Sequence, residues 1–258
     1  MSVSSLSQAA RAVIDGYRHF RLGSAVSSVP YFNNKRLKAR AALRAVIGKG
    51  SLREIRDEAH ALAIRNHADI DRLADGSLKK LLTDANLGLD CSAYAYYILD
   101  AESIARGKGP LRSHLRFTHA RGIIGKIRAG IRPVENCDVA TLADAANSRA
   151  IEIHDAKPGD MITMINDGDE SEHDHILVIS EIEFSTNAPR KISYTHAVAY
   201  PEDGVYGTGI KQGTIELSDN SLAITDGLWN EGGSAAGAER IFRRASHSRT
   251  ELRRLNWF

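Results

Sequence analysis

The sequence predicts an α+β fold in which helices come first along the chain and an antiparallel β-sheet follows. Apolar residues recur at helical spacing through most of the first 85 residues and again over 91–104. After residue 150, short runs rich in β-branched residues alternate with turn-forming segments. Because helices and strands are segregated along the chain, we expect the strands to pair antiparallel. With 258 residues, 43% of them hydrophobic, the chain is long enough to bury a sizeable core.

The first 150 residues contain several helix signals. Ser51 and Glu54 have the spacing of a capping box and predict a helix that begins at residue 52. A second helix is expected over 35–46, because the glycines that follow would end it. A third runs over 91–104, and a shorter one is expected over 139–146.

Four strands are expected in the second part of the chain. They cover residues 161–165, 175–182, 191–200 and 214–217. The strand that begins at His175 has the strongest pattern and follows an acidic loop over 166–174. A short extended piece is also expected at 132–134, within a stretch of mixed turns.

Cysteine usage and hydropathy exclude several classes of protein. The two cysteines, Cys91 and Cys137, form no Cys-x-x-Cys pair, which excludes a four-cysteine zinc site and argues against a disulfide framework. The N-terminal residues lack the apolar core of a signal peptide, and no run of 18 apolar residues occurs. We therefore expect a cytoplasmic protein without a membrane span, with non-classical export left open.

Positive charge is concentrated in the first 50 residues, which contain nine Lys or Arg and one acidic residue, Asp15. This imbalance has two interpretations. One is an anionic partner for the N-terminal region, such as nucleic acid or another phosphate-rich polymer. The other, which we favour, is a solvated helix face that docks on the more acidic remainder of the chain.

A cysteine stands at the start of an apolar helix, in the segment Asp90-Cys91-Ser92. The first turn of a helix presents free backbone N–H groups and a partial positive charge. Both stabilise a thiolate, so this position is expected to lower the pKa of the Cys91 thiol. The same N–H groups can bind an oxyanion. The alternative is a small buried core residue, which is the commonest fate of a free cysteine.

Two histidines stand on consecutive expected strands. His175 opens the strongest strand beside the acidic loop, and His196 lies in the next strand. Neighbouring antiparallel strands can place such side chains next to each other on one face of a sheet. A thiolate needs a base, and the base needs a group that orients it, so the pair suits a cysteine nucleophile. A metal site on His173, His175 and His196 is the competing interpretation.

Four motifs, in order, resemble those of the NlpC-type papain-like cysteine peptidases, a superfamily of bacterial cell-wall endopeptidases. Asp90-Cys91-Ser92 is similar to the nucleophile motif Asp-Cys-Ser-Gly, and an apolar helix follows it. Pro158-Gly159-Asp160 resembles the turn that leads into a strand in this family. In this family the base histidine opens a strand of the form His-x-x-x-x-Ile, and the segment His175-Ile-Leu-Val-Ile179 resembles it. Tyr194-Thr195-His196-Ala197 is similar to the family's aromatic-x-His-Ala segment. The resemblance covers about residues 86–200.

The resemblance implies a papain-like core in which the helix that carries the nucleophile packs on an antiparallel sheet that carries both histidines. It implies that Cys91 is the nucleophile, that His175 is its base and that His196 orients His175. Asp90 and Ser92 would support the oxyanion region. The implied activity is hydrolysis of an amide bond through a thioester, on peptidoglycan-type (muropeptide) or isopeptide bonds, with neither cofactor nor metal.

Three departures from the family pattern keep alternatives open. Ala93 replaces the family's glycine, residues 105–150 form an apparent insertion between nucleophile and base, and the expected export signal is missing. The alternatives are an acyltransferase with the same triad, a metal-dependent hydrolase or metal-binding domain on His173, His175 and His196, and a non-catalytic binding module on a degenerate peptidase fold.

The expected organisation has three parts. Residues 1–85 form a basic, helical N-terminal extension. Residues 86–217 form the cysteine hydrolase core, which includes the insertion at 105–150. Residues 218–258 form an extension that is rich in arginine towards its end.

Overall fold

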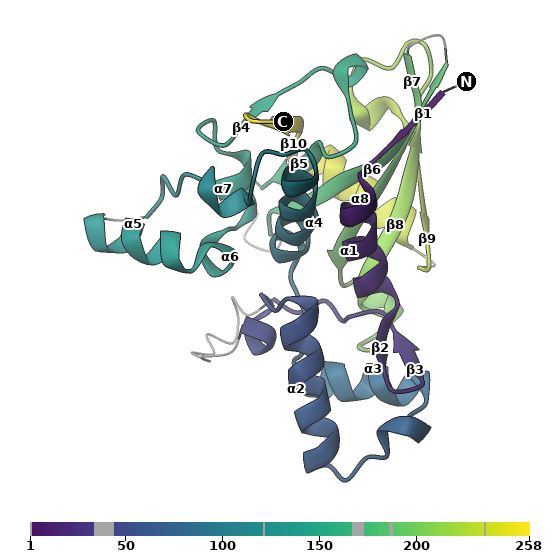
Figure 1. Ribbon diagram of the computed structural model, residues 1–258. Coiled ribbons are helices and arrows are strands. Elements are labelled where there is room, and N and C mark those ends of the chain that lie inside the picture. Colours follow the sequence, from purple (N-terminus) through teal and green to yellow (C-terminus); the bar gives the residue numbers. More distant parts are fainter. Residues whose placement is uncertain (1, 34–43, 121, 167–172, 186–187, 235) are drawn as a thin grey trace.

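The protein combines helices with an antiparallel sheet, as the sequence predicts (Figure 1). The computed structural model describes residues 2–33, 44–120, 122–166, 173–185, 188–234 and 236–258. Most of the helix predicted over 35–46 and most of the acidic loop over 166–174 lie outside the described residues.

An eight-stranded sheet forms the centre of the molecule, and each of its described pairings is antiparallel. Seven strands follow one another in the spatial order β4 (Ser148–Ala150), β10 (Arg249–Leu255), β5 (Met161–Ile165), β6 (His175–Ser185), β7 (Ala188–Val198), β8 (Gly209–Glu216) and β9 (Leu228–Gly232). The eighth, β1 (Ser2–Ser5), pairs with residues 181–184 of β6, beyond the stretch 175–178 that β5 occupies. Along one edge of β6, β5 therefore pairs with the first half of the strand and β1 with the second half.

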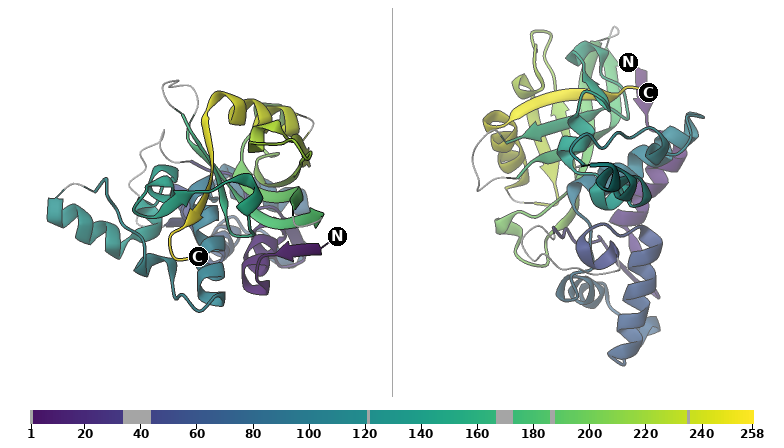
Figure 2. Two further views of the ribbon diagram at one scale, coloured as in Figure 1. Left: turned by 90° about the horizontal axis from the view of Figure 1, so that it is seen from above. Right: turned by 90° about the vertical axis from the view of Figure 1, so that its left-hand side faces the viewer.

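Helices surround the sheet, and a small hairpin follows the first of them in the chain (Figure 2). The helices are α1 (Gln8–Arg18), α2 (Leu52–Arg65), α3 (Asp75–Asp84), α4 (Cys91–Ala105), α5 (Gly122–Ile131), α6 (Pro133–Asn136), α7 (Val139–Ala143) and α8 (Gly237–His247). The hairpin consists of β2 (Phe20–Leu22) and β3 (Ala25–Ser27) and packs with α2 and α3 at one end of the molecule (Figure 1).

Several elements agree with the sequence-based expectations. The capping box is confirmed: Ser51 Oγ accepts from the backbone N–H of Glu54, and the Glu54 carboxylate accepts from the N–H of Ser51 at 2.9 Å. The strand predicted over 161–165 is confirmed at both ends. The strand expected over 214–217 instead begins at Gly209, so its first half was missed.

Two expectations are wrong. The first 85 residues are not entirely helical, because they include β1, β2 and β3. The segment Ser2–Ser5 has no apolar run, and it forms a strand by pairing with β6. The extended piece expected at 132–134 is also wrong: Pro133 lies in the first turn of α6, where its fixed φ suits a helix and its missing N–H leaves no bond unmade.

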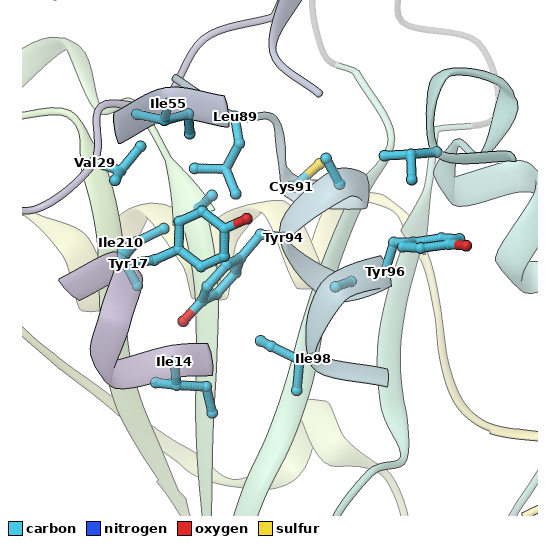
Figure 3. Close-up of a cluster of buried hydrophobic side chains, with 14 of the residues drawn as sticks. Ile14, Tyr17, Val29, Ile55, Leu89, Cys91, Tyr94, Tyr96, Ile98 and Ile210 are labelled. Atoms are coloured by element: carbon cyan, nitrogen blue, oxygen red, sulfur yellow. The ribbon is translucent and has the colours of Figure 1, made fainter. Parts of the chain in front are cut away.

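Helix α4 lies between the sheet and α1, and its side chains are buried almost all round. The ring of Tyr94 meets the ring of Tyr17 from α1 edge to face, with centroids 5.7 Å apart (Figure 3). Its hydroxyl lies 2.9 Å from Thr195 Oγ1 on β7. These contacts tie α1, α4 and β7 into one core, and Cys91 lies at the end of α4 beside that core (Figure 3).

The sheet is covered on both faces, which explains the continuous apolar run of β6. Ile176 and Val178 belong to the core with α4, whereas Leu177 and Ile179 belong to a second core with Ile241 of α8. Alternate residues of one strand therefore face two different helices. Both faces of β6 need apolar side chains, so its sequence shows no alternation with polar residues.

The Pro-Gly-Asp turn leads into β5, as the resemblance implies, and it also anchors β10. Gly159 has a φ of 93°, in the left-handed region that favours glycine. The buried Asp160 carboxylate accepts two hydrogen bonds from the Arg254 guanidinium, at 2.7 and 2.8 Å, and a third from the N–H of Lys157. This bidentate pair fixes β10 against the turn.

We expect Arg254→Ala to lower the free energy of unfolding by about 3 kcal/mol, because it leaves the buried Asp160 carboxylate without its counter-ion. Arg53→Ala is the matched control. It removes an arginine from an exposed ion pair with Asp57 and should change the free energy of unfolding by about 0.5 kcal/mol or less. Urea denaturation of the two variants checks this difference, and equal effects would contradict a structural role for the Asp160–Arg254 pair.

Candidate active site

The start of α4 is held by a side-chain cap and a buried ion pair. Asp90 is the N-cap residue, and its carboxylate accepts from the backbone N–H of Ala93 at 2.7 Å. The Lys49 ammonium lies 3.0 Å from that carboxylate and donates to Ser92 Oγ at 2.8 Å and to the Cys137 carbonyl at 2.9 Å. Asp90 and Ser92, two of the predicted site residues, therefore fix the position of Cys91 between them.

Lys49 remains charged in this buried setting. Burial by itself would lower its pKa, but the Asp90 carboxylate and the neighbouring cysteines outweigh burial and raise the pKa. Sequence reasoning missed this residue. It stands between two glycines with no motif around it, and its partner Asp90 is 41 positions away.

The Cys91 thiol does not have the lowered pKa that its helix position predicts. Burial raises its pKa to about 12, and the Asp90 carboxylate adds to the increase. Lys49, Arg244 and a hydrogen bond from the backbone of Ile176 act in the opposite direction and do not compensate. The thiol is therefore protonated at neutral pH, because desolvation and a nearby anion outweigh the helix terminus.

Two backbone donors beside the thiol are not used within the part of the chain that the structure describes. The N–H groups of Cys91 and Ser92 have no acceptor there, whereas the N–H of Ala93 is bonded to Asp90. Unused N–H groups in the first turn of a helix can bind an oxyanion. The oxyanion role expected for this region stays a prediction, and the side chains of Asp90 and Ser92 hold the start of the helix.

The structure brings His175 and His196 together in one buried row with a carboxylate. His175 Nε2 lies 2.7 Å from His196 Nδ1, and His196 Nε2 lies 2.7 Å from Glu231 Oε2. The side chains of His196 and Glu231 are fully buried. Tyr194 donates a further hydrogen bond to Glu231 at 3.2 Å. The row joins β6 and β7, which are consecutive along the chain, to β9, which lies beyond β8 in the sheet.

Glu231 sets the positions of the protons in this row. Burial alone would raise its pKa, but His196 and the hydrogen bonds it receives lower the pKa, so the carboxylate is ionised and can only accept. Because an ionised carboxylate can only accept, the neutral form of His196 has its proton on Nε2, and in that form its Nδ1 accepts from Nε2 of His175. His175 Nδ1 is left with a lone pair, which is the form a general base needs.

Sequence reasoning also missed Glu231, which falls in the segment 218–258 that was set apart as an extension. That segment contributes β9 and β10 to the central sheet. A signal for Glu231 was present in the sequence. It stands two positions after Trp229, which is buried, so the alternation of a strand puts both side chains on the same face.

His175 is neutral at physiological pH. Burial lowers its pKa well below the usual value, and the positive charge of Arg244 and the neighbouring His196 lower it further. His175 lies in a cavity of about 440 Å³ that is also lined by Arg240, Arg243 and Arg244 of α8. Arg240 is paired with Glu202, and Asp174 also lines the cavity, so the three arginines exceed the acidic side chains around His175.

Cys91 lines an adjoining cavity of about 360 Å³. Asn33, His173 and Asp174 line both cavities, so they stand between the thiol side and the imidazole side. In the described structure no hydrogen bond joins the Cys91 thiol to His175; the thiol is instead bonded to the N–H of Ile176, the next residue. A larger cavity, of about 770 Å³, lies at the other end of the row and reaches Glu231 but not Cys91.

The described residues give no support to a metal centre on His173, His175 and His196. No group of three or more His, Cys, Asp or Glu side chains is arranged among them to hold a metal ion. His175 Nε2 and both ring nitrogens of His196 are instead engaged in hydrogen bonds, to each other and to Glu231.

Comparison of the chain with protein-family models, with curated proteins and with solved structures finds no match. The interpretation of the site therefore depends on its own geometry and on the motifs in the sequence.

Iodoacetamide should modify Cys91 slowly at pH 7 and about tenfold faster for each unit of pH up to about pH 9, because only the thiolate reacts. Cys137 should react later, since it is completely buried whereas Cys91 is 5% exposed at a cavity. Intact-mass spectrometry with peptide mapping follows both sites, and Cys137→Ala identifies the Cys91 adduct. Rapid alkylation of Cys91 that does not change between pH 6 and pH 8 would contradict a protonated resting thiol.

Proposed function

We propose that the chain is a cysteine-dependent amide hydrolase with a papain-like core, in which Cys91 is the nucleophile and His175 the base. The observation that carries the proposal is the buried row His175–His196–Glu231, which leaves a lone pair on Nδ1 of His175. His175 is next in the chain to Ile176, whose backbone N–H is bonded to the Cys91 thiol. The packing of α4 on β6 and β7 supports it, because the family has its nucleophile helix on the strands of the two histidines.

In the proposed reaction, the thiol proton moves to Nδ1 of His175 as the sulfur attacks the carbonyl carbon of an amide. The negative oxygen is bound by the N–H groups of Cys91 and Ser92. The carbon–nitrogen bond then breaks, and the imidazolium gives its proton to the leaving amine. Water, activated by His175, attacks the thioester and restores the thiol. His196 and Glu231 stabilise the imidazolium and keep its ring in place, as a carboxylate does in a serine triad.

The first step requires the thiol to leave the N–H of Ile176 and reach His175. It also requires a change in proton affinity, because the pKa of Cys91 lies far above that of His175 in the resting site. A negatively charged substrate would supply part of that change. Its charge would offset the positive charge of Arg244, which lowers the pKa of His175.

The basic cavity at His175 therefore favours a substrate that carries carboxylates, such as an acidic peptide or a muropeptide. Isopeptides with a nearby carboxylate fit the same description. Acyl transfer to an amine in place of water would use the same residues.

A second candidate function is a non-catalytic binding module on the same fold. The raised pKa of the Cys91 thiol and the hydrogen bond to Ile176 in place of His175 favour it. It would use the two adjoining cavities to hold an acidic ligand without turnover. It differs from the enzyme proposal in that replacement of Cys91 should leave ligand binding intact and no acyl-enzyme should form.

The test is turnover on a panel of muropeptides and isopeptides, with an intact-mass search for an acyl-enzyme. Cys91→Ala and His175→Ala should each remove nearly all activity, and the double variant should lose little more, because the two groups act as a unit. His196→Ala should cost less, since nucleophile and base remain. Cys137→Ala is the matched control and should keep near wild-type turnover. Full activity of Cys91→Ala would exclude the cysteine mechanism.

Glu231→Gln should lower kcat by about a hundredfold or more and leave KM nearly unchanged, because an amide no longer fixes the proton on Nε2 of His196.

The acid limb of kcat/KM for the wild type should lie below pH 6.5, because the pKa of His175 is lowered and the base stays unprotonated to lower pH. A pH–rate profile checks both. Loss of activity with EDTA, together with a His173→Ala defect as large as that of His175→Ala, would instead support the metal-dependent alternative.

A further inference from the structure

Helix α5 (Gly122–Ile131) presents an apolar face that no other described part of the chain covers. Its four isoleucines, Ile123, Ile124, Ile127 and Ile131, are 79%, 84%, 58% and 75% exposed. At roughly 100° per residue they fall within one arc of about 100° around the helix. Ala129 lies on the opposite side and is only 1% exposed. The apolar face of this amphipathic helix therefore points to solvent and not to the core.

The position of α5 makes this face accessible. The helix projects away from the sheet and from the other helices, in Figure 1 and in the left view of Figure 2. It contacts α6, the next element along the chain. The end of α6 and the residues after it, at 135, 136, 138 and 139, line the Cys91 cavity. Four clustered isoleucines in water are unfavourable in a folded protein, so such a patch usually has a partner.

The charge around α5 indicates the chemistry of that partner. Residues 103–134 contain eight Lys or Arg and no Asp or Glu, and two of the eight, Arg106 and Arg132, are paired with Glu102 and Glu135 at the margins of this range. Among them, Arg112, Arg116 and Arg128 are exposed in the structure. Arg128 is one position after Ile127, at the margin of the isoleucine arc. A surface that is both apolar and strongly basic complements one that offers hydrocarbon beneath a layer of negative charge.

We propose that α5 docks on the surface of an anionic lipid bilayer, with its isoleucines at the boundary between headgroups and acyl chains. The surrounding cations lie against the lipid phosphates. The helix has 10 residues, and no helix of the described chain is long and apolar enough to cross a membrane, so α5 lies in the plane of the interface. This docking does not depend on the proposed reaction at Cys91.

Two other occupants fit the surface less well. Nucleic acid would complement the cations, but it would gain nothing from four exposed isoleucines. A second copy of this chain could cover the isoleucines, but it would bring two segments with eight cations each against one another. Of these three occupants, a bilayer is the one that offers a counterpart to both features.

The test is co-sedimentation of the full chain with sucrose-loaded vesicles of phosphatidylcholine alone or of phosphatidylcholine with phosphatidylglycerol. We expect binding to the anionic vesicles at least tenfold tighter than to the neutral ones, and a marked decrease with salt. The double variant Ile124→Glu/Ile127→Glu should bind about a hundredfold more weakly, because two apolar anchors are lost. Arg128→Glu should weaken binding about tenfold.

Leu222→Glu is the matched control. Leu222 is 83% exposed and belongs to the connection between β8 and β9, which is not part of the α5 segment, so its replacement should leave vesicle binding unchanged. All replaced side chains are exposed, and circular dichroism with thermal melting verifies that each variant is folded. Equal binding to neutral and anionic vesicles, or wild-type binding by the double variant, would overturn the proposal. So would absence of vesicle binding by a wild-type chain that instead dimerises through α5 or binds DNA through the same residues.

Discussion

The buried ammonium of Lys49 is the interaction on which the arrangement of the site depends. It joins the N-terminal part of the chain, the first turn of α4 and the carbonyl of Cys137, which lies in the segment between Cys91 and His175. Loss of one partner would leave the other charge buried and uncompensated, which is far more costly than loss of a surface ion pair. The three segments are therefore held together next to the thiol, and Cys91 has a fixed position relative to the sheet.

The same ion pair carries a chemical consequence. Asp90 caps α4 and thereby fixes the helix, but its charge also helps to keep the Cys91 thiol protonated. Lys49 offsets only part of this effect. Asp90 thus stabilises the start of the helix and at the same time disfavours the thiolate. A negatively charged ligand in the cavity at His175 would offset the charge of Arg244 and so favour transfer of the thiol proton to His175.

Local patterns in the sequence predicted much of the fold and part of the site. The capping box at Ser51, the strand over 161–165 and the helix that begins at Cys91 all depend on neighbouring residues, and all are confirmed. The side-by-side placement of His175 and His196 also followed from the order of two adjacent strands.

What the sequence did not reveal depends on distant contacts. Glu231 meets His196 across β8, from 35 positions away, and β10 enters the sheet beside β5 although it is almost 90 positions later in the chain. The thiol pKa was expected to fall because helix position is visible in a sequence, whereas burial and the distance to Asp90 are not.

The place of β10 in the sheet has a consequence for how the molecule is made. Strand β5 has β6 on one side and β10 on the other, and among the described strands β4 pairs with β10 alone. During synthesis, residues 161–165 must therefore wait with one row of backbone groups unpaired until residues 249–255 emerge. An open apolar edge of this kind invites pairing with another nascent chain. During folding, β10 therefore competes with strands of neighbouring chains for the open edge of β5.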